Sequence, residues 1–140
     1  MPWLEPVLAA AAVLAADQLT KHIVLARPAY AAPGPRAFFD IQCIINRRGA
    51  LLPMARPLRY FAFVLCAAVA LVALRQDVFA HNALGAMGVG LALGGIAGNF
   101  VDLFRRDGIV DFLVIGPLPV SNIADWAIAV GLSLALWALV

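Results

Sequence analysis

Several of the side chains from which hydrolytic and metal sites are usually built are scarce in this chain. Its histidines, cysteines and serines are His22, His81, Cys43, Cys66, Ser121 and Ser133. The histidines lie near opposite ends of their helical segments, and no residues near the cysteines have metal-binding spacing. A serine triad and a metal site therefore lack their ligands, and we interpret the cysteines as structural thiols. We expect no metal and no cofactor.

Charged residues are scarce as well. They make up 13% of the 140 residues, whereas hydrophobic residues make up 64% and the mean hydropathy is +0.95. A water-soluble domain keeps roughly a quarter of its residues charged, so this composition indicates a protein embedded in a lipid bilayer. The 10 basic residues are too few and too scattered for a nucleic-acid surface, which leaves membrane lipids as the expected surroundings and no nucleic acid as a partner.

Long apolar stretches predict the architecture. A window of about 20 residues, the length of helix that crosses a hydrocarbon core, finds them near residues 3–25, 58–74, 83–103 and 123–140. The first stretch lacks the basic start and the small-residue cleavage site of a signal peptide, so we interpret it as a retained helix. The sequence thus predicts one all-α membrane domain, residues 1–140, with four transmembrane helices.

The segment between the first two predicted helices, residues 26–57, has a different character. It is rich in proline and glycine, which interrupt helices. Its centre, residues 38–45, is rich in aromatic and β-branched residues that partly alternate. We expect a small sheet or strand pair here, lying at the membrane surface.

Polar side chains inside the predicted helices are candidate functional residues, because burying them is costly unless they are paired or face a cavity. Asp17 and Lys21 are four residues apart on one helix face, which permits an ion pair and suits an interfacial anchor as well as a substrate-facing role. Asn99 and Asp102 share a face of the third helix beside glycines and alanine that allow close helix contact. We interpret these two as supporting a site.

Two further carboxylates suggest the chemistry. Asp111 lies in an apolar, β-branched run, where desolvation raises the pKa of a carboxyl group. Asp125 falls in the first turn of the fourth helix, a position that acidic residues favour without any catalytic role. The connection between them contains Gly116, Pro117 and Pro119, so it can turn back and bring the carboxyls together. Two adjacent carboxyls in a low dielectric share one proton, which is the chemistry of an aspartic peptidase.

Short motifs spread along nearly the whole chain resemble those of the lipoprotein signal peptidase family, also called signal peptidase II. In order, they are residues 17–24, 38–51, 94–102, 109–112 and 122–125. The resemblance implies a peptidase of the bacterial plasma (inner) membrane with a multi-pass, four-helix fold and a small extracytoplasmic β-cradle between helices one and two. It also implies that Asp111 and Asp125 are catalytic. Its substrate is expected to be a diacylglyceryl-modified prolipoprotein, cut just before the lipidated cysteine.

Orientation cannot be taken from charge in the usual way. Arginines are concentrated on the side of the two long loops, which by the positive-inside rule would place those loops in the cytoplasm. The basic C-terminal tail that is common in the family is missing here, so the side expected to be cytoplasmic lacks its usual charges. We therefore follow the family, which implies that the active site is directed toward the extracytoplasmic face.

Supporting roles are expected for a further set of residues. The candidates for substrate binding or for bracing the site are Asp17, Lys21, Asn46, Gly98, Asn99, Asp102 and Asn122. Family members usually carry arginine directly after the third-helix aspartate, whereas Leu103 stands here, so Arg105 and Arg106 are candidates to replace it. We expect a monomer. The alternative is a non-catalytic membrane protein, either a lipopeptide-binding relative or a small carrier that uses its carboxylates as a proton or cation path.

Overall fold

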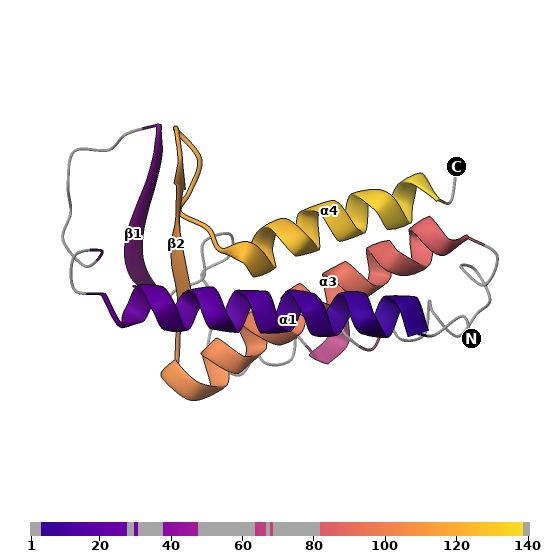
Figure 1. Cartoon of the computed structure of the whole chain (residues 1–140), viewed down its shortest axis with the longest axis horizontal. Helices are drawn as coiled ribbons and strands as arrows, with labels where there is room; N and C mark the ends of the chain where they lie inside the picture. Colours follow the sequence, from indigo (N-terminus) through magenta and orange to yellow (C-terminus); the bar gives the residue numbers. More distant parts are fainter. Residues whose placement is uncertain are drawn as a thin grey trace.

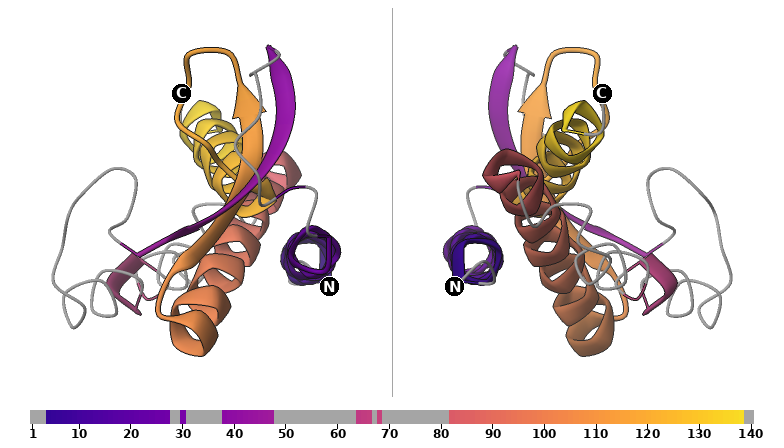
Figure 2. Two further views of the ribbon diagram at one scale, coloured as in Figure 1. Left: turned by 90° about the vertical axis from the view of Figure 1, so that its left-hand side faces the viewer. Right: turned by 90° about the vertical axis from the view of Figure 1, so that its right-hand side faces the viewer.

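The computed structural model describes residues 4–27, 30, 38–47, 64–66, 68 and 82–138 of the chain. The elements follow in the order α1 (Leu4–Leu25), β1 (Phe39–Asn46), α3 (Ala83–Arg106), β2 (Ile109–Ile115) and α4 (Ile123–Trp137). The helices run along the length of the molecule, and the two-stranded sheet stands across one end of them (Figure 1). Seen from that end, α3 lies against both α1 and α4 (Figure 2).

Small residues set the contact between α1 and α3. A Cβ atom added to Gly94 would stand only 2.5 Å from the carbonyl oxygen of Ala10, and Gly90 meets the backbone of Pro6 in the same way. Contacts on the two helices therefore advance together along the sequence, which makes α1 and α3 parallel. Both helices end at the sheet.

The contact between α3 and α4 runs in the opposite sense. Gly88 lies against Gly131 near the start of α3, and Gly95 lies against Ala124 near the start of α4. The two helices are therefore antiparallel. As a result, the first turn of α4 lies at the sheet end of the molecule, beside the C-terminal half of α3 (Figure 1).

Two of the described helices are long and apolar enough to cross a membrane. They are α1, with 22 residues and a mean hydropathy of 1.4, and α3, with 24 residues and a mean hydropathy of 1.6. α4 is apolar but, with 15 residues, shorter. The helix predicted at 58–74 lies outside the described residues, apart from helical residues at 64–66 and 68.

The sheet corrects one expectation from the sequence. A strand pair confined to residues 26–57 was expected, but β1 pairs antiparallel with β2, which follows α3. The cause is the parallel arrangement of α1 and α3, because the segments that leave their ends emerge side by side. A strand must pair its backbone groups, and β2 is rich in the β-branched residues that favour strands.

Helix α3 also runs further than predicted. The apolar stretch was expected to end near residue 103, whereas α3 continues to Arg106. Asp107 then ends the helix in the left-handed conformation, with φ of 52°, and its N–H donates to the carbonyl of Leu103. The extra turn matters because it places Arg106 on the same face as Asp102.

Candidate active site

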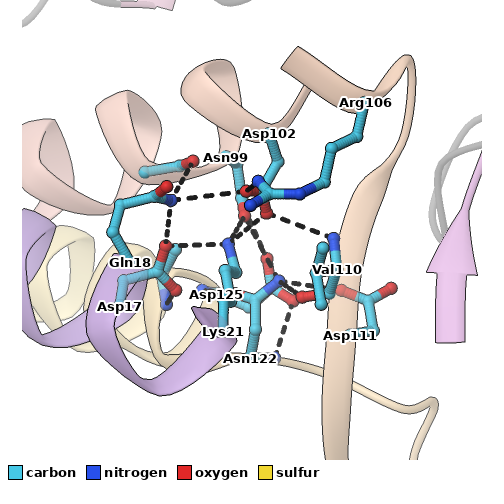
Figure 3. A network of polar contacts seen from close by, with 12 residues as sticks. Asp17, Gln18, Lys21, Asn99, Asp102, Arg106, Val110, Asp111, Asn122 and Asp125 are labelled. Atoms are coloured by element: carbon cyan, nitrogen blue, oxygen red, sulfur yellow. Dashed lines mark hydrogen bonds and ion pairs between the residues drawn. The ribbon is translucent and has the colours of Figure 1, made fainter. Parts of the chain in front are cut away.

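Polar side chains are buried where the helices meet the sheet (Figure 3). The polar residues with 3% exposure or less are Asp17, Lys21, Asn99, Asp102, Asp111 and Asn122. They come from α1, α3, β2 and the residue that precedes α4. Because a buried polar group without a partner costs about 1–3 kcal/mol, the arrangement depends on how completely these groups are paired.

A cluster of charges lies at the base of this region. The ammonium of Lys21 lies 2.7 Å from a carboxylate oxygen of Asp17 and 2.7 Å from one of Asp102. The guanidinium of Arg106 lies 2.7 Å from the other oxygen of Asp102. Two cations thus balance two carboxylates, which is the condition under which charges can be buried without a large penalty. We call these four residues the charge cluster.

The charge cluster also anchors the backbone of the elements that carry Asp111 and Asp125. Asp17 Oδ1 accepts a hydrogen bond of 3.0 Å from the N–H of Ala124, at the start of α4. Asp102 Oδ2 accepts one of 3.1 Å from the N–H of Val110, at the start of β2. The carboxylates of α1 and α3 therefore fix where α4 and β2 begin.

Gln18 is a member of this network that the sequence-based candidates did not include. Its amide nitrogen lies 3.2 Å from Asp17 Oδ2, 3.1 Å from the Gly98 carbonyl and 3.4 Å from Asp102 Oδ1. Gln18 is an amide within an apolar helix, and burying an amide is costly unless it is hydrogen-bonded. The reasoning that selected Asn99 from the sequence therefore applies equally to Gln18. Gly98 itself leaves room for the cluster, because a Cβ atom there would stand 2.5 Å from Asp17 Oδ2.

The connection between β2 and α4 turns back, as predicted. The carbonyl of Ser121 accepts hydrogen bonds from the N–H groups of Phe112 at 2.8 Å and Leu113 at 2.7 Å, and the N–H of Ser121 donates to the carbonyl of Leu113 at 3.0 Å. Gly116 makes the reversal with φ of 51°, which glycine adopts without strain. The start of α4 is thereby held beside the middle of β2.

A β-bulge aligns Asn46 with Asp111. Ile41 pairs with Leu113, and Ile44 pairs with Asp111, so β1 has one more residue than β2 between these two pairs. Directly paired residues share a face of the sheet, and the extra residue therefore moves the following residues of β1 to the opposite faces. Asn46 consequently lies on the face of Asp111, and its amide donates to Asp111 Oδ2 at 3.1 Å.

Both oxygens of each candidate catalytic carboxylate accept a hydrogen bond from an amide. Asp111 accepts from Asn46 on Oδ2 and from the Asn122 side chain on Oδ1, the latter at 2.8 Å. Asp125 accepts from Asn99 on Oδ1 at 2.8 Å and from the backbone N–H of Asn122 on Oδ2 at 3.3 Å. Asn122 therefore contacts both carboxylates, and it also caps α4 by accepting from the N–H of Asp125.

The environment of Asp111 favours its protonated form. Burial is the main cause and raises the pKa of Asp111 to about 6; the negative charge of Asp125 acts in the same direction. Hydrogen bonds from Asn46 and Asn122 and the charge of Lys21 oppose the rise. A carboxyl that still holds its proton near pH 6 can act as an acid where an exposed one cannot.

The two arginine candidates, Arg105 and Arg106, differ in their surroundings. Arg106 belongs to the charge cluster, whereas the neighbouring Arg105 is exposed. Leu103, which directly follows Asp102, is fully buried. Among the described residues, no group of three or more histidine, cysteine, aspartate or glutamate side chains could hold a metal ion.

Comparison with known proteins gives the family. Residues 9–140 match the family model described as signal peptidase (SPase) II. A lipoprotein signal peptidase of Azoarcus sp. (strain BH72) is 37% identical over 150 residues, which cover 99% of this chain and 82% of that protein. The lipoprotein signal peptidase of Moorella thermoacetica is 32% identical over 142 residues, covering 99% of this chain and 93% of that protein.

A solved structure shares the fold. A bacterial membrane enzyme determined by the in meso method at 2.3 Å resolution superimposes with a TM-score of 0.84. Its sequence is 24% identical, and the match covers 96% of this chain and 86% of that one. This likeness is one of fold, and two of the described helices are long and apolar enough to cross a membrane. The match over residues 9–140 and the relatives at more than 30% identity show that the chain belongs to the signal peptidase II family.

Proposed function

We propose that this chain is an aspartic endopeptidase that works within the membrane and removes the signal peptide from diacylglyceryl-modified prolipoproteins, cutting before the lipidated cysteine. The observation that carries the proposal is the joint coordination of Asp111 and Asp125 by Asn122, at the point where the helices meet the sheet. Relatives that match almost the whole chain are named lipoprotein signal peptidases, which supports the choice of substrate.

The reaction requires one protonated and one ionised carboxyl. The ionised carboxylate takes a proton from a water molecule while the water oxygen attacks the scissile carbonyl carbon, and the protonated carboxyl gives its proton to the carbonyl oxygen. The resulting gem-diol collapses when the first carboxyl passes its proton to the amide nitrogen, which leaves as an amine, and the second regains a proton from a hydroxyl group. The pair ends in its initial state, with one water consumed.

Other residues have supporting roles in this proposal. Asn46, Asn99 and Asn122 hold the carboxylates, and the charge cluster with Gly98 holds the elements that carry them. Arg106 acts through Asp102, and Arg105 is left for contact with substrate or lipid head groups at the surface. The enzyme is a monomer of the bacterial inner membrane, and the sheet end of the molecule is on the extracytoplasmic side.

The carrier alternative has less support. A cation or proton path needs carboxylates that are free to exchange partners. Asp17 and Asp102 are instead fully buried and already paired with Lys21 and Arg106. No observation on the described residues favours transport over hydrolysis.

The proposal is tested by replacing each carboxyl with its isosteric amide. Purified Asp111→Asn and Asp125→Asn variants are incubated with a diacylglyceryl-modified prolipoprotein, and cleavage is followed by gel shift and mass spectrometry. We expect each variant to lose roughly 10³-fold or more in rate, because an amide can neither accept the proton from water nor return it. Asp107→Asn is the matched control, since Asp107 is exposed and asparagine tolerates its left-handed backbone. Cleavage by either test variant at the control rate contradicts the proposal.

A further inference from the structure

We propose that Asp125 is the base of the pair and Asp111 is the acid, and that Lys21 and Asn99 are the positioning residues that fix this assignment. The inference rests on the proposed function, but its first test below does not need cleavage. Each carboxylate accepts two of the hydrogen bonds described above, so the number of donors does not distinguish them. The inference follows instead from the kind of donor and from the element on which each carboxylate lies.

The amide of Asn99 is held in one orientation. The Lys21 ammonium has three protons and three acceptors within reach: Asp17 at 2.7 Å, Asp102 at 2.7 Å and Asn99 Oδ1 at 3.1 Å. The side chain of Asn122 donates to the same Asn99 oxygen at 3.2 Å. A flipped Asn99 would point its NH₂ group at an ammonium, so the amide must present its nitrogen to Asp125 (Figure 3).

This orientation stabilises a negative charge on Asp125. The hydrogen bond from Asn99 Nδ2 to Asp125 Oδ1 is short, at 2.8 Å, and the donor is polarised by the cation bound to its oxygen. Asp125 also lies in the first turn of α4 and completes a capping box with Asn122. The positive end of the helix dipole and the capping N–H both favour a carboxylate over a carboxylic acid.

Asp111 has neither of these features. It lies in a strand between Val110 and Phe112, both buried, and it accepts hydrogen bonds from the side-chain amides of Asn46 and Asn122. Burial raises the pKa of Asp111 above the ordinary carboxyl value, and an ionised Asp125 raises it further. The shared proton is therefore held by Asp111.

Four charged groups lie around the pair of carboxylates. Lys21 and Asp17 face it from α1, and Asp102 and Arg106 lie behind Lys21 on α3. These four sum to no net charge, so their influence depends on direction. Lys21 is the member in contact with Asn99, the donor to Asp125, but its charge also favours the ionised form of Asp111. The assignment therefore depends on the orientation of Asn99 and on the first turn of α4, and not on the net field of the charge cluster.

The first test detects the proton directly. Infrared spectra of the protein in lipid at about pH 5, above the ordinary carboxyl pKa and below that of Asp111, report the C=O stretch of a buried protonated carboxyl. We expect this band in the wild type, in Asp125→Asn and in the control Asp107→Asn, and its loss in Asp111→Asn. A band that survives in Asp111→Asn, or one that is lost in both active-site variants, overturns the assignment whether or not the protein cleaves prolipoproteins.

The second test uses a matched pair of asparagines, one on each carboxylate. Removing a donor to a carboxylate makes that group harder to ionise. Asn99→Ala is therefore expected to move the acidic limb of the kcat/KM profile upward by about one pH unit, because Asp125 then keeps its proton, and cannot act as the base, up to a higher pH. Asn46→Ala is expected to move the alkaline limb upward instead, because it acts on Asp111.

The outcomes of the second test are distinct. If the two variants exchange limbs, the roles of Asp111 and Asp125 are reversed and the inference is wrong. Parallel loss of rate at every pH, with neither limb moved, shows that Asn46 and Asn99 act only structurally and also overturns it. A wild type that fails to cleave refutes the proposed function and leaves the infrared test to judge the assignment.

Discussion

The two ends of the helix bundle are held by different forces. At the end away from the sheet, Gly88 and Gly131 let α3 and α4 touch backbone to backbone, beside a small apolar cluster of Ala86, Val89 and Ala135. At the sheet end, the helices are joined by ion pairs and amide hydrogen bonds. Dispersion contacts are individually weak and tolerate small displacements, whereas buried polar networks depend on every member. Substitutions at the first end should change stability alone, and substitutions at the second should change stability and active-site geometry together.

The largest effect is expected at Lys21. Lys21→Met removes the cation that lies between two fully buried carboxylates, and breaking such a pair costs about 3–5 kcal/mol. Asn99 also loses the partner that orients it. Chemical unfolding in detergent should show the loss of stability, and cleavage should be lost even under conditions where the variant is folded.

A second substitution sharpens this result. Adding Asp17→Asn to Lys21→Met restores the charge balance, so the double variant should regain part of the stability lost by the single one, by an amount that a double-mutant cycle measures. Activity should stay low, because the amide of Asn99 is still not held. If the two losses are simply additive, the charge cluster does not act as a unit.

The next effect compares one glycine from each end. A methyl group at Gly98 would press on Asp17, and one at Gly88 would press on the backbone of Gly131. Such overpacking typically costs about 1–3 kcal/mol, and we expect both alanine variants to unfold more easily. Measured well below the unfolding transition, Gly98→Ala should have a lower kcat while Gly88→Ala should retain wild-type kcat. Equal kcat values would show that the two ends do not differ in this way.

The sequence predicted the components of the site better than their connections. Burial cost alone selected Asp17, Asn99 and Asp102, which the structure brings together with Lys21. The turn that returns the chain to α4 also followed from its glycine and prolines. The clustering of these residues and the turn could be anticipated because each depended on local composition, whereas the roles of the residues in a site stay predictions.

The pairing of β1 with β2 could not be read in the same way. Strand pairing depends on which segments emerge side by side, and this was fixed by the parallel packing of α1 and α3. The bulge that turns Asn46 toward Asp111 is likewise a property of register between segments far apart in the sequence. Only the resemblance to a family could suggest Asn46 as a site residue.

The role of Arg106 depended on a helix boundary. A hydropathy window stops where charges begin, so it ended α3 near residue 103, one turn too early. Arginines in the last turn of a helix are favourable for its dipole, and α3 continues through both of them. Because this last turn is helical, Arg106 and Asp102, which are four residues apart, lie on the same face of α3.

Replacing Arg106 in that turn is expected to have a smaller effect on stability, and Arg105 offers a matched control. Arg106→Met removes one charged partner of Asp102 and should lower the free energy of unfolding by about 1–2 kcal/mol, discounted because the side chain is 25% exposed. Arg105→Met makes the same chemical change at an exposed neighbour and should stay within about 0.5 kcal/mol of wild type. A similar loss in both variants would mean that the Asp102 pair adds nothing to stability.

The smallest effect concerns the response of stability to pH. Because the pKa of Asp111 is about 6 in the folded protein and near 4 when unfolded, the folded state binds more protons between these values. Stability contributed by this group is therefore fully present below about pH 4, declines as the pH rises toward 6 and then levels off. Urea unfolding across this range should show the decline in the wild type, and Asp111→Asn should make the decline smaller.

Gly88→Ala, at the opposite end of the bundle, should lower stability equally at every pH and keep the same slope. If it altered the slope, the charge state of the sheet end would depend on packing at the other end, and the two ends would not be independent.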